Sequence, residues 1–217
     1  MAHPIVTQLT LVAGSANTIA TAQSLVAPAL TATLNGASVA AGIAVLTPAR
    51  RVIVTSSADD SGITFTITGT ARAEMGSVTF SETITGANAG AAATTQDFAT
   101  VTRVVASGST AGTITVGTND TASGPWVPWD SYRTPFSVSL MTNIMSGTPT
   151  FQVDVTYDDV FGTWLPTNVP FPRALGLTGM TGLVANTAGS ISVPVRASRL
   201  TLVAAGSVQL TQLQAKG

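Results

Sequence analysis

The chain has 217 residues, of which 9% are charged and 45% hydrophobic, and its formal net charge is −1. Its cations are scattered rather than clustered, so the chain lacks the basic surface that nucleic-acid phosphates require, and we expect no nucleic-acid partner. Cysteine is absent, which excludes disulfides, thiolate chemistry and cysteine-ligated zinc. The length fits one large β domain or two small ones, and either can bury a sizeable core.

The first residues carry neither the basic nor the apolar region of a secretory signal, so we expect the protein to be made in a cytosol and to leave it without a signal peptide, for example by lysis or particle assembly. Further on, threonine, serine and glycine interrupt every apolar stretch well before the roughly 20 residues that a membrane-spanning helix needs. We therefore expect no membrane partner.

Residues 1–46 contain no lysine, arginine, aspartate or glutamate. Alternating apolar positions over residues 4–12 predict a strand. Residues 30–34, followed by Asn35-Gly36, predict a hairpin with a type I′ turn. An uncharged segment of this kind fits an arm that lies on a neighbouring subunit, and equally a first strand of the local sheet followed by a loop.

Residues 47–69 have the pattern of a β-hairpin. A β-branched run at 51–55 is followed by a turn-forming cluster at 57–62 and by alternating residues at 63–68. The same order of arginine, apolar strand, glycine-containing turn and alternating strand returns at residues 103–117 and 194–211. We expect an all-β chain of antiparallel β-sandwich or jelly-roll-like units built from repeated hairpins, without substantial helix.

Three segments are expected along the chain: an N-terminal arm with the first strand or strands at 1–46, a first β-sandwich unit at 47–120 and a second at 121–217. The boundary is placed in the turn-rich stretch 118–128. The second unit contains a long excursion rich in proline and glycine at 158–188, and a loop of that length is usually functional or bound to a partner.

The acidic residues offer little for catalysis. His3 is the sole histidine, which excludes a nucleophile–histidine–acid triad. Two groups of carboxylates resemble the paired acids of glycoside hydrolases, Asp59-Asp60 and Asp154 with Asp158-Asp159, although adjacent aspartates in turns usually only form the turn. The second group could also ligate calcium, but its spacing matches no calcium-loop signature. We expect no catalytic residue, no cofactor and no metal.

Four aromatic side chains are the candidates for contact with a partner: Trp126, Trp129, Tyr132 and Trp164. Exposed rings of this type stack on sugars or anchor protein interfaces. The alternative is that they form a core at the junction of the two units.

Five segments occur in this order: PARRVIVTSSADDSGITFTITGT, SETITGANAG, TTQDFATVTRVVASGSTAGTITVGT, SGPWVPWDSYRTPF and PVRASRLTLVAAGSVQLTQLQ. Together they resemble a family of small structural proteins of tailed-bacteriophage virions. The resemblance implies a non-enzymatic virion component, and we expect a capsid decoration, or cement, protein that stabilises the coat lattice. The alternative is a subunit of a tail or neck appendage or a fibre, attached to the particle or binding host-surface glycan through exposed aromatics. Its partners would be the coat protein or connector and fibre proteins, and we expect a homo-oligomer.

Overall fold

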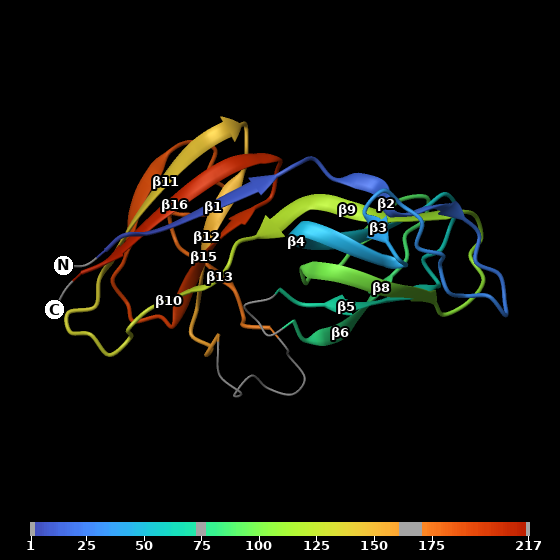
Figure 1. Cartoon of the computed structure of the whole chain (residues 1–217), viewed down its shortest axis with the longest axis horizontal. Helices are drawn as coiled ribbons and strands as arrows, with labels where there is room; N and C mark the ends of the chain where they lie inside the picture. The colour runs from blue at the N-terminus through green and yellow to red at the C-terminus, as the bar shows by residue number, and fades with distance from the viewer. Residues whose placement is uncertain (1–2, 73–76, 161–170, 216–217) are drawn as a thin grey trace. The chain divides into compact units, whose positions relative to one another are not determined.

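The computed structural model of the chain describes residues 3–72, 77–160 and 171–215 (Figure 1). These residues form sixteen β-strands and no helix, in antiparallel sheets, which confirms the all-β, sandwich-like fold predicted from the sequence. Within these ranges there is accordingly no helix with the length and hydropathy to cross a membrane. The strands are β1 (Ile5–Leu11), β2 (Ser15–Gln23), β3 (Val39–Ala40), β4 (Ile43–Ser56), β5 (Thr64–Thr70), β6 (Thr79–Thr85), β7 (Ala91–Ala93), β8 (Phe98–Ala106), β9 (Ile114–Ser123), β10 (Val127–Pro128), β11 (Val138–Gly147), β12 (Phe151–Thr156), β13 (Leu175–Gly176), β14 (Thr187–Ile191), β15 (Ala197–Leu202) and β16 (Gly206–Gln214).

The chain divides into two compact units. Unit 1 contains Met1–Ala13 and Thr121–Gly217, and unit 2 contains Gly14–Asp120. The chain returns from unit 2 to unit 1 between Asp120 and Thr121, at the position of the boundary expected after residue 120. The expected separate segment 1–46 is divided instead, because β1 pairs along its whole length with β16 of unit 1 whereas β2 pairs with β9 in unit 2. Residues 5–11 are therefore a strand of the local sheet, and their interpretation as an arm on another subunit is wrong.

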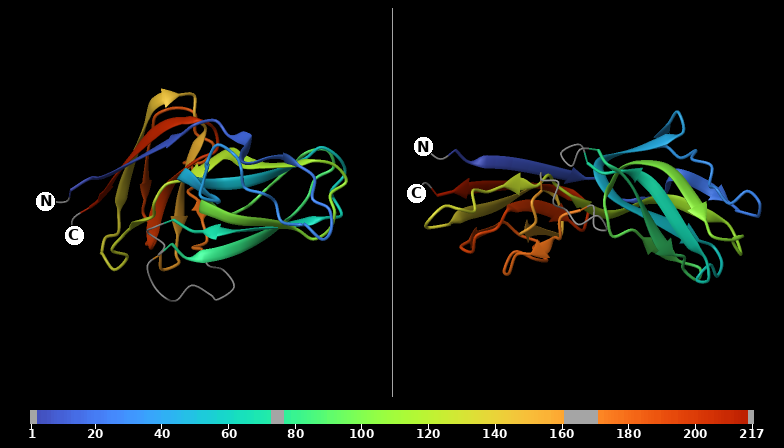
Figure 2. Two further views of the ribbon diagram at one scale, coloured as in Figure 1. Left: turned by 45° about the vertical axis from the view of Figure 1, so that its right-hand side comes forward. Right: turned by 90° about the horizontal axis from the view of Figure 1, so that it is seen from below.

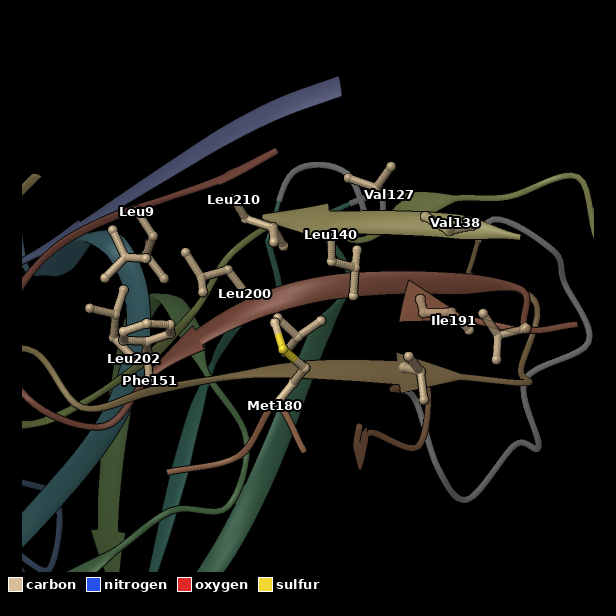
Figure 3. Close-up of a cluster of buried hydrophobic side chains, with 14 of the residues drawn as sticks. Leu9, Val127, Val138, Leu140, Phe151, Met180, Ile191, Leu200, Leu202 and Leu210 are labelled. Atoms are coloured by element: carbon tan, nitrogen blue, oxygen red, sulfur yellow. The ribbon is translucent and has the colours of Figure 1, made fainter. Parts of the chain in front are cut away.

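Unit 1 is built from two sheets. One has the strand order β1-β16-β11-β14, and the other contains β13, β12 and β15, with β10 and the end of β9 also paired to β15. Buried apolar side chains from both sheets gather between them, including Leu140 from β11, Phe151 from β12 and Leu200 from β15 (Figure 3). The predicted excursion at 158–188 contributes to this core through Met180, which is 2% exposed. Its residues 161–170 lie outside the described part.

In unit 2, β8, β5 and β6 lie side by side (Figure 2), and β4 lies between β8 and β9. The first part of β4 pairs with β8, and its last residues pair with β7, with a register shift between Val45 and Arg50. The predicted alternation of β5 is observed: Phe65 and Ile67 are fully buried, and Thr64, Thr66 and Thr68 are partly exposed. Threonine side chains cover the other face of this sheet and bond across strands, as between the hydroxyls of Thr66 and Thr83 at 2.9 Å.

The three strand–turn–strand segments form strands, but none is a hairpin, so the predicted pairing is wrong. In the first, β8 lies between β4 and β5; in the second, β4 lies between β8 and β9. In the third, β15 and β16 belong to different sheets of unit 1, so the short turn between them crosses from one sheet to the other. The physical reason is that an alternating strand can pair with any neighbour that covers its apolar face, and most neighbours here are distant in sequence.

The predicted type I′ hairpin at Asn35-Gly36 is also displaced. The hairpin joins β3 to β4, and its two turn residues are Ala41 and Gly42, with φ angles of 50° and 78°. Positive φ at both central residues is what a type I′ turn requires. Asn35 instead accepts a hydrogen bond from the backbone N–H of Thr21 through its side-chain oxygen, at 2.9 Å. It thus fastens the segment after residue 30 to β2.

Candidate functional site

Two of the four candidate aromatic side chains lie in the interior of unit 1. Trp126 is 5% exposed and Trp129 is 8% exposed, while Trp164 lies outside the described residues. The indole N–H of Trp129 donates to Ser198 Oγ at 2.8 Å, and the Ser198 hydroxyl donates to Gln212 Oε1. This buried chain of hydrogen bonds joins the segment after β10 to both sheets, so Trp129 stabilises the core and does not present its ring to solvent.

Trp126 packs in a small cluster with Val160 and Ala197. The guanidinium carbon of Arg199 lies 4.4 Å from the centre of the Trp126 ring, a cation–π geometry. Arg199 also points its Nε toward Asp154 Oδ2 at 3.4 Å, with 18% of the arginine side chain exposed and 4% of the aspartate. Trp126 thus packs against the buried Arg199–Asp154 pair and presents no ring face to solvent.

Asp154 is the centre of this polar group. Its Oδ2 also accepts a hydrogen bond from the Thr201 hydroxyl at 2.6 Å, and its Oδ1 accepts one from Gln152 Nε2 at 2.7 Å. Both carboxylate oxygens are therefore engaged by protein donors, and the residue is 2% exposed. A carboxylate that is buried and bonded in this way is shielded from calcium or substrate in solution, which favours a structural role.

The other candidate carboxylates are engaged in turns and ion pairs. Asp158 accepts hydrogen bonds from Arg173 Nη2 at 2.7 Å and Nε at 3.1 Å, and from the Arg173 backbone N–H at 2.7 Å. The side-chain bond to Arg173 is the largest cause that holds the pKa of Asp158 below its usual range, and the backbone bond adds to it. Asp159 also has a bonded or electrostatic partner.

In unit 2, Asp59 caps its own turn through Ser61, whose hydroxyl and backbone N–H lower the pKa of Asp59. Its neighbour Asp60 is fully buried, and its Oδ1 accepts the Ala111 N–H at 2.8 Å. The described ranges 3–72, 77–160 and 171–215 contain no group of three histidine, aspartate or glutamate residues that could hold a metal ion.

Tyr132 is the exposed member of the aromatic set. It lies in the turn after Trp129, 83% of the residue is exposed, and the guanidinium carbon of Arg196 lies 5.7 Å from its ring centre. The turn is held by a hydrogen bond from the Tyr132 N–H to Asp130 Oδ1 at 3.2 Å, and by Arg133, which donates to the carbonyl of Ala215. The Tyr132–Arg196 pair therefore presents a ring and a cation to solvent on a fixed turn.

The outer face of the four-stranded sheet of unit 1 was not identified from the sequence. Alternate residues of its strands are buried in the core, for example Leu9 and Leu11 in β1, so the intervening residues form the opposite face. We call this surface the neutral face, because none of its members is charged. They are Val6, Gln8 and Thr10 in β1, Gln209, Thr211 and Leu213 in β16, Ser139, Met141 and Asn143 in β11, and Ala188 and Ser190 in β14; Ser207 of β16 points to the same side but is 3% exposed.

Strand register orders the neutral face in rows across the sheet. Val6 lies opposite Thr211, which lies opposite Met141 on its other side, and Met141 lies opposite Ala188. Val6 is 51% exposed and Met141 is 55% exposed. Amides and hydroxyls fix neighbouring positions, as in the bond from Gln8 Nε2 to Ser207 Oγ at 3.0 Å. The sequence signal for this face is the absence of charge from alternate positions of β1, β11, β14 and β16. These strands are far apart in the sequence, and only the fold places them side by side.

The comparisons with known proteins assign no family. No protein-family model matches the chain, and no curated protein matches it. A search of solved structures found similarity to a crystal structure of the infectious bursal disease virus VP2 subviral particle, with 11% sequence identity and a TM-score of 0.19, over 100% of this chain and 72% of that one. At this low similarity the match supports no conclusion about the fold or the function of this chain.

Proposed function

We propose that the protein is a non-enzymatic structural component of a tailed-bacteriophage virion, and specifically a decoration protein that binds and stabilises the coat lattice. The neutral face of unit 1 carries the proposal. It is broad, ordered by strand register and free of charged side chains, with exposed apolar residues such as Met141 between amides and hydroxyls. Such a surface binds through shape, apolar contact and hydrogen bonds, and the symmetry of a lattice multiplies modest contacts.

The state of the carboxylates supports a structural role. Asp154, Asp158 and Asp60 each accept hydrogen bonds that fix the backbone or a neighbouring side chain. A general acid or base must reach substrate, or reach it through one water molecule. The partners of these residues are instead internal to the chain, as expected for groups that stabilise a rigid particle protein.

A second candidate is a subunit of a tail, neck or fibre appendage that binds host-surface glycan. The exposed Tyr132–Arg196 pair favours it, because an aromatic ring can stack on the apolar face of a sugar while a guanidinium donates to its hydroxyls. Trp126 and Trp129 do not support this candidate, since both are buried. Loss of glycan binding in Tyr132→Ala, with unchanged attachment to particles, would identify it.

The decoration proposal is tested by removing the gene from the virus and adding the purified protein back to the resulting particles. We expect particles without the protein to break at lower temperature, and the wild-type chain to restore their resistance. Met141→Glu, which places a charge in the neutral face, should bind poorly, whereas Thr83→Glu in unit 2 should bind as the wild type does. Because the neutral face has no charge, binding should change little with salt concentration. Particles that neither weaken without the protein nor bind it when it is added would contradict the proposal.

A further inference from the structure

Strand β1 forms one end of the four-stranded sheet of unit 1. Its seven residues, Ile5–Leu11, pair with β16 without a register shift, and within the described residues no strand pairs with its other side. An end strand leaves a row of backbone N–H and C=O groups that can pair with another chain. Proteins usually protect such edges with charges, prolines, bulges or very short strands. The sequence IVTQLTL has none of these features.

The other end strands of the described chain are protected. β13 has two residues, and β14 has five, with Gly189 in the middle. β6 carries Glu82, whose carboxylate accepts hydrogen bonds from the backbone N–H groups of Thr95 and Gln96. The free side of β2 is covered by hydrogen bonds from residues 35–38. Strand β1 is thus the long unprotected edge of the described structure.

We propose that β1 pairs with β1 of a second copy of the chain, antiparallel, about a two-fold axis at Gln8. In this register Gln8 lies opposite itself, Val6 lies opposite Thr10, and Ile5 lies opposite Leu11. Residues directly opposite each other point to the same side of a sheet, so Leu9 and Leu11 of both copies remain on the core side. Ile5 points to the same side of the sheet as the core residues Leu9 and Leu11 but is 41% exposed. In the dimer it gains Leu11 of the second copy as an apolar neighbour.

The absence of charged side chains from this edge favours a second copy as the partner. A charged partner would lose hydration at this edge without meeting an opposite charge, since β1 and the neutral face contain none. A second copy supplies an equally neutral edge of the same length. The side-chain amide of Gln8 has both donors and an acceptor, so two such amides can bond to each other across a two-fold axis. Pairing would join two four-stranded sheets into one, with the neutral face continuous across both.

The test places charges at the proposed axis. In Gln8→Lys, and likewise in Gln8→Glu, two like charges would lie directly opposite each other, and we expect the dimer dissociation constant to rise by about tenfold or more. A mixture of the two variants places opposite charges together and should restore dimers, now as mixed pairs. The matched control is Gln209→Lys, which adds a charge to the same face on the adjacent strand, opposite Gln8. Sedimentation velocity over a concentration series measures these four samples and the wild-type chain.

Dimers of the wild-type chain that Gln8→Lys weakens, that the mixture restores and that Gln209→Lys leaves intact would establish the edge pairing. A wild-type chain that remains monomeric would overturn it, and so would dimers broken by Gln209→Lys but not by Gln8→Lys, the pattern expected if faces stacked. Hydrogen exchange of the wild-type β1 amides gives an independent measurement if a variant fails to fold, because pairing requires protection that rises with protein concentration. The inference does not depend on the proposed function: absence from virus particles would refute the decoration role and leave the dimer unaffected.

Discussion

The substitution Asp154→Ala tests the buried polar group of unit 1 most sharply. It removes the acceptor for Thr201, for Gln152 and for Arg199, at 2.6, 2.7 and 3.4 Å. Removal of one member of a buried ion pair destabilises a protein by about 3–5 kcal/mol. Arg199 retains its contact with the Trp126 ring and some access to water, so we expect the lower end, about 3 kcal/mol. In a unit of this size that corresponds to a decrease in Tm of about 12 °C.

Tryptophan fluorescence isolates this effect, because all three tryptophans of the chain, at positions 126, 129 and 164, belong to the sequence of unit 1. Far-UV circular dichroism follows both units in the same urea titration. The matched control is Asp130→Ala, which removes a carboxylate of unit 1 that is 56% exposed and 3.6 Å from Arg133 Nε, and we expect a loss below about 1 kcal/mol. If both variants unfolded within about 1 kcal/mol of the wild type, the proposed stabilising role of the Asp154 group would be refuted.

Three further outcomes follow from the structure. Arg173 holds the pKa of Asp158 below its usual range. This ion pair therefore stabilises the fold above the unfolded-state pKa of about 4, and the stabilisation is lost as the pH falls through the lower folded-state pKa. When the pH is lowered from about 6 to about 2, Asp158→Asn should lose less stability than the wild type, and equal losses would contradict the ion pair. An added Cβ at Gly117 would lie 1.9 Å from a backbone oxygen, so Gly117→Ala should destabilise unit 2 by about 1–3 kcal/mol in circular dichroism, whereas Gly62→Ala, with no atom within 4 Å, should be nearly neutral. Tyr132→Ala should leave the fluorescence-detected stability of unit 1 within about 0.5 kcal/mol of the wild type, because its ring is exposed, and a larger loss would show that the ring packs on the protein.

The strands were predictable from the sequence, and their partners were not. Alternation along a strand is a local property, so the buried Phe65 and Ile67 and the outward threonines of β5 follow from the sequence. Pairing joins residues far apart in the chain, as Thr7 and Leu210 are in the pairing of β1 with β16. A short turn with glycine is compatible with a hairpin and with a crossing between sheets. The sequence pattern alone therefore could not separate the two.

The same limit applies to the candidate site. Trp129 and Tyr132 lie three positions apart, yet one is buried and the other is 83% exposed. What distinguishes them is Ser198, which lies on a strand 69 positions away in the sequence and accepts a hydrogen bond from the indole N–H of Trp129. The sequence identifies Asp154 as a candidate carboxylate, but not its hydrogen-bond donors Arg199 and Thr201, which belong to β15. The local sequence therefore identifies candidate residues, whereas their burial and their hydrogen-bond partners can be known only from the fold.

The most direct test of the proposed decoration role is the number of copies of the protein in purified virus particles, measured by quantitative mass spectrometry against the major coat protein. A copy number comparable to that of the coat protein is the result that the account predicts. A small number that matches the symmetry of a connector or a fibre would favour the appendage and its exposed Tyr132–Arg196 pair. Absence from the particle would contradict the virion role altogether.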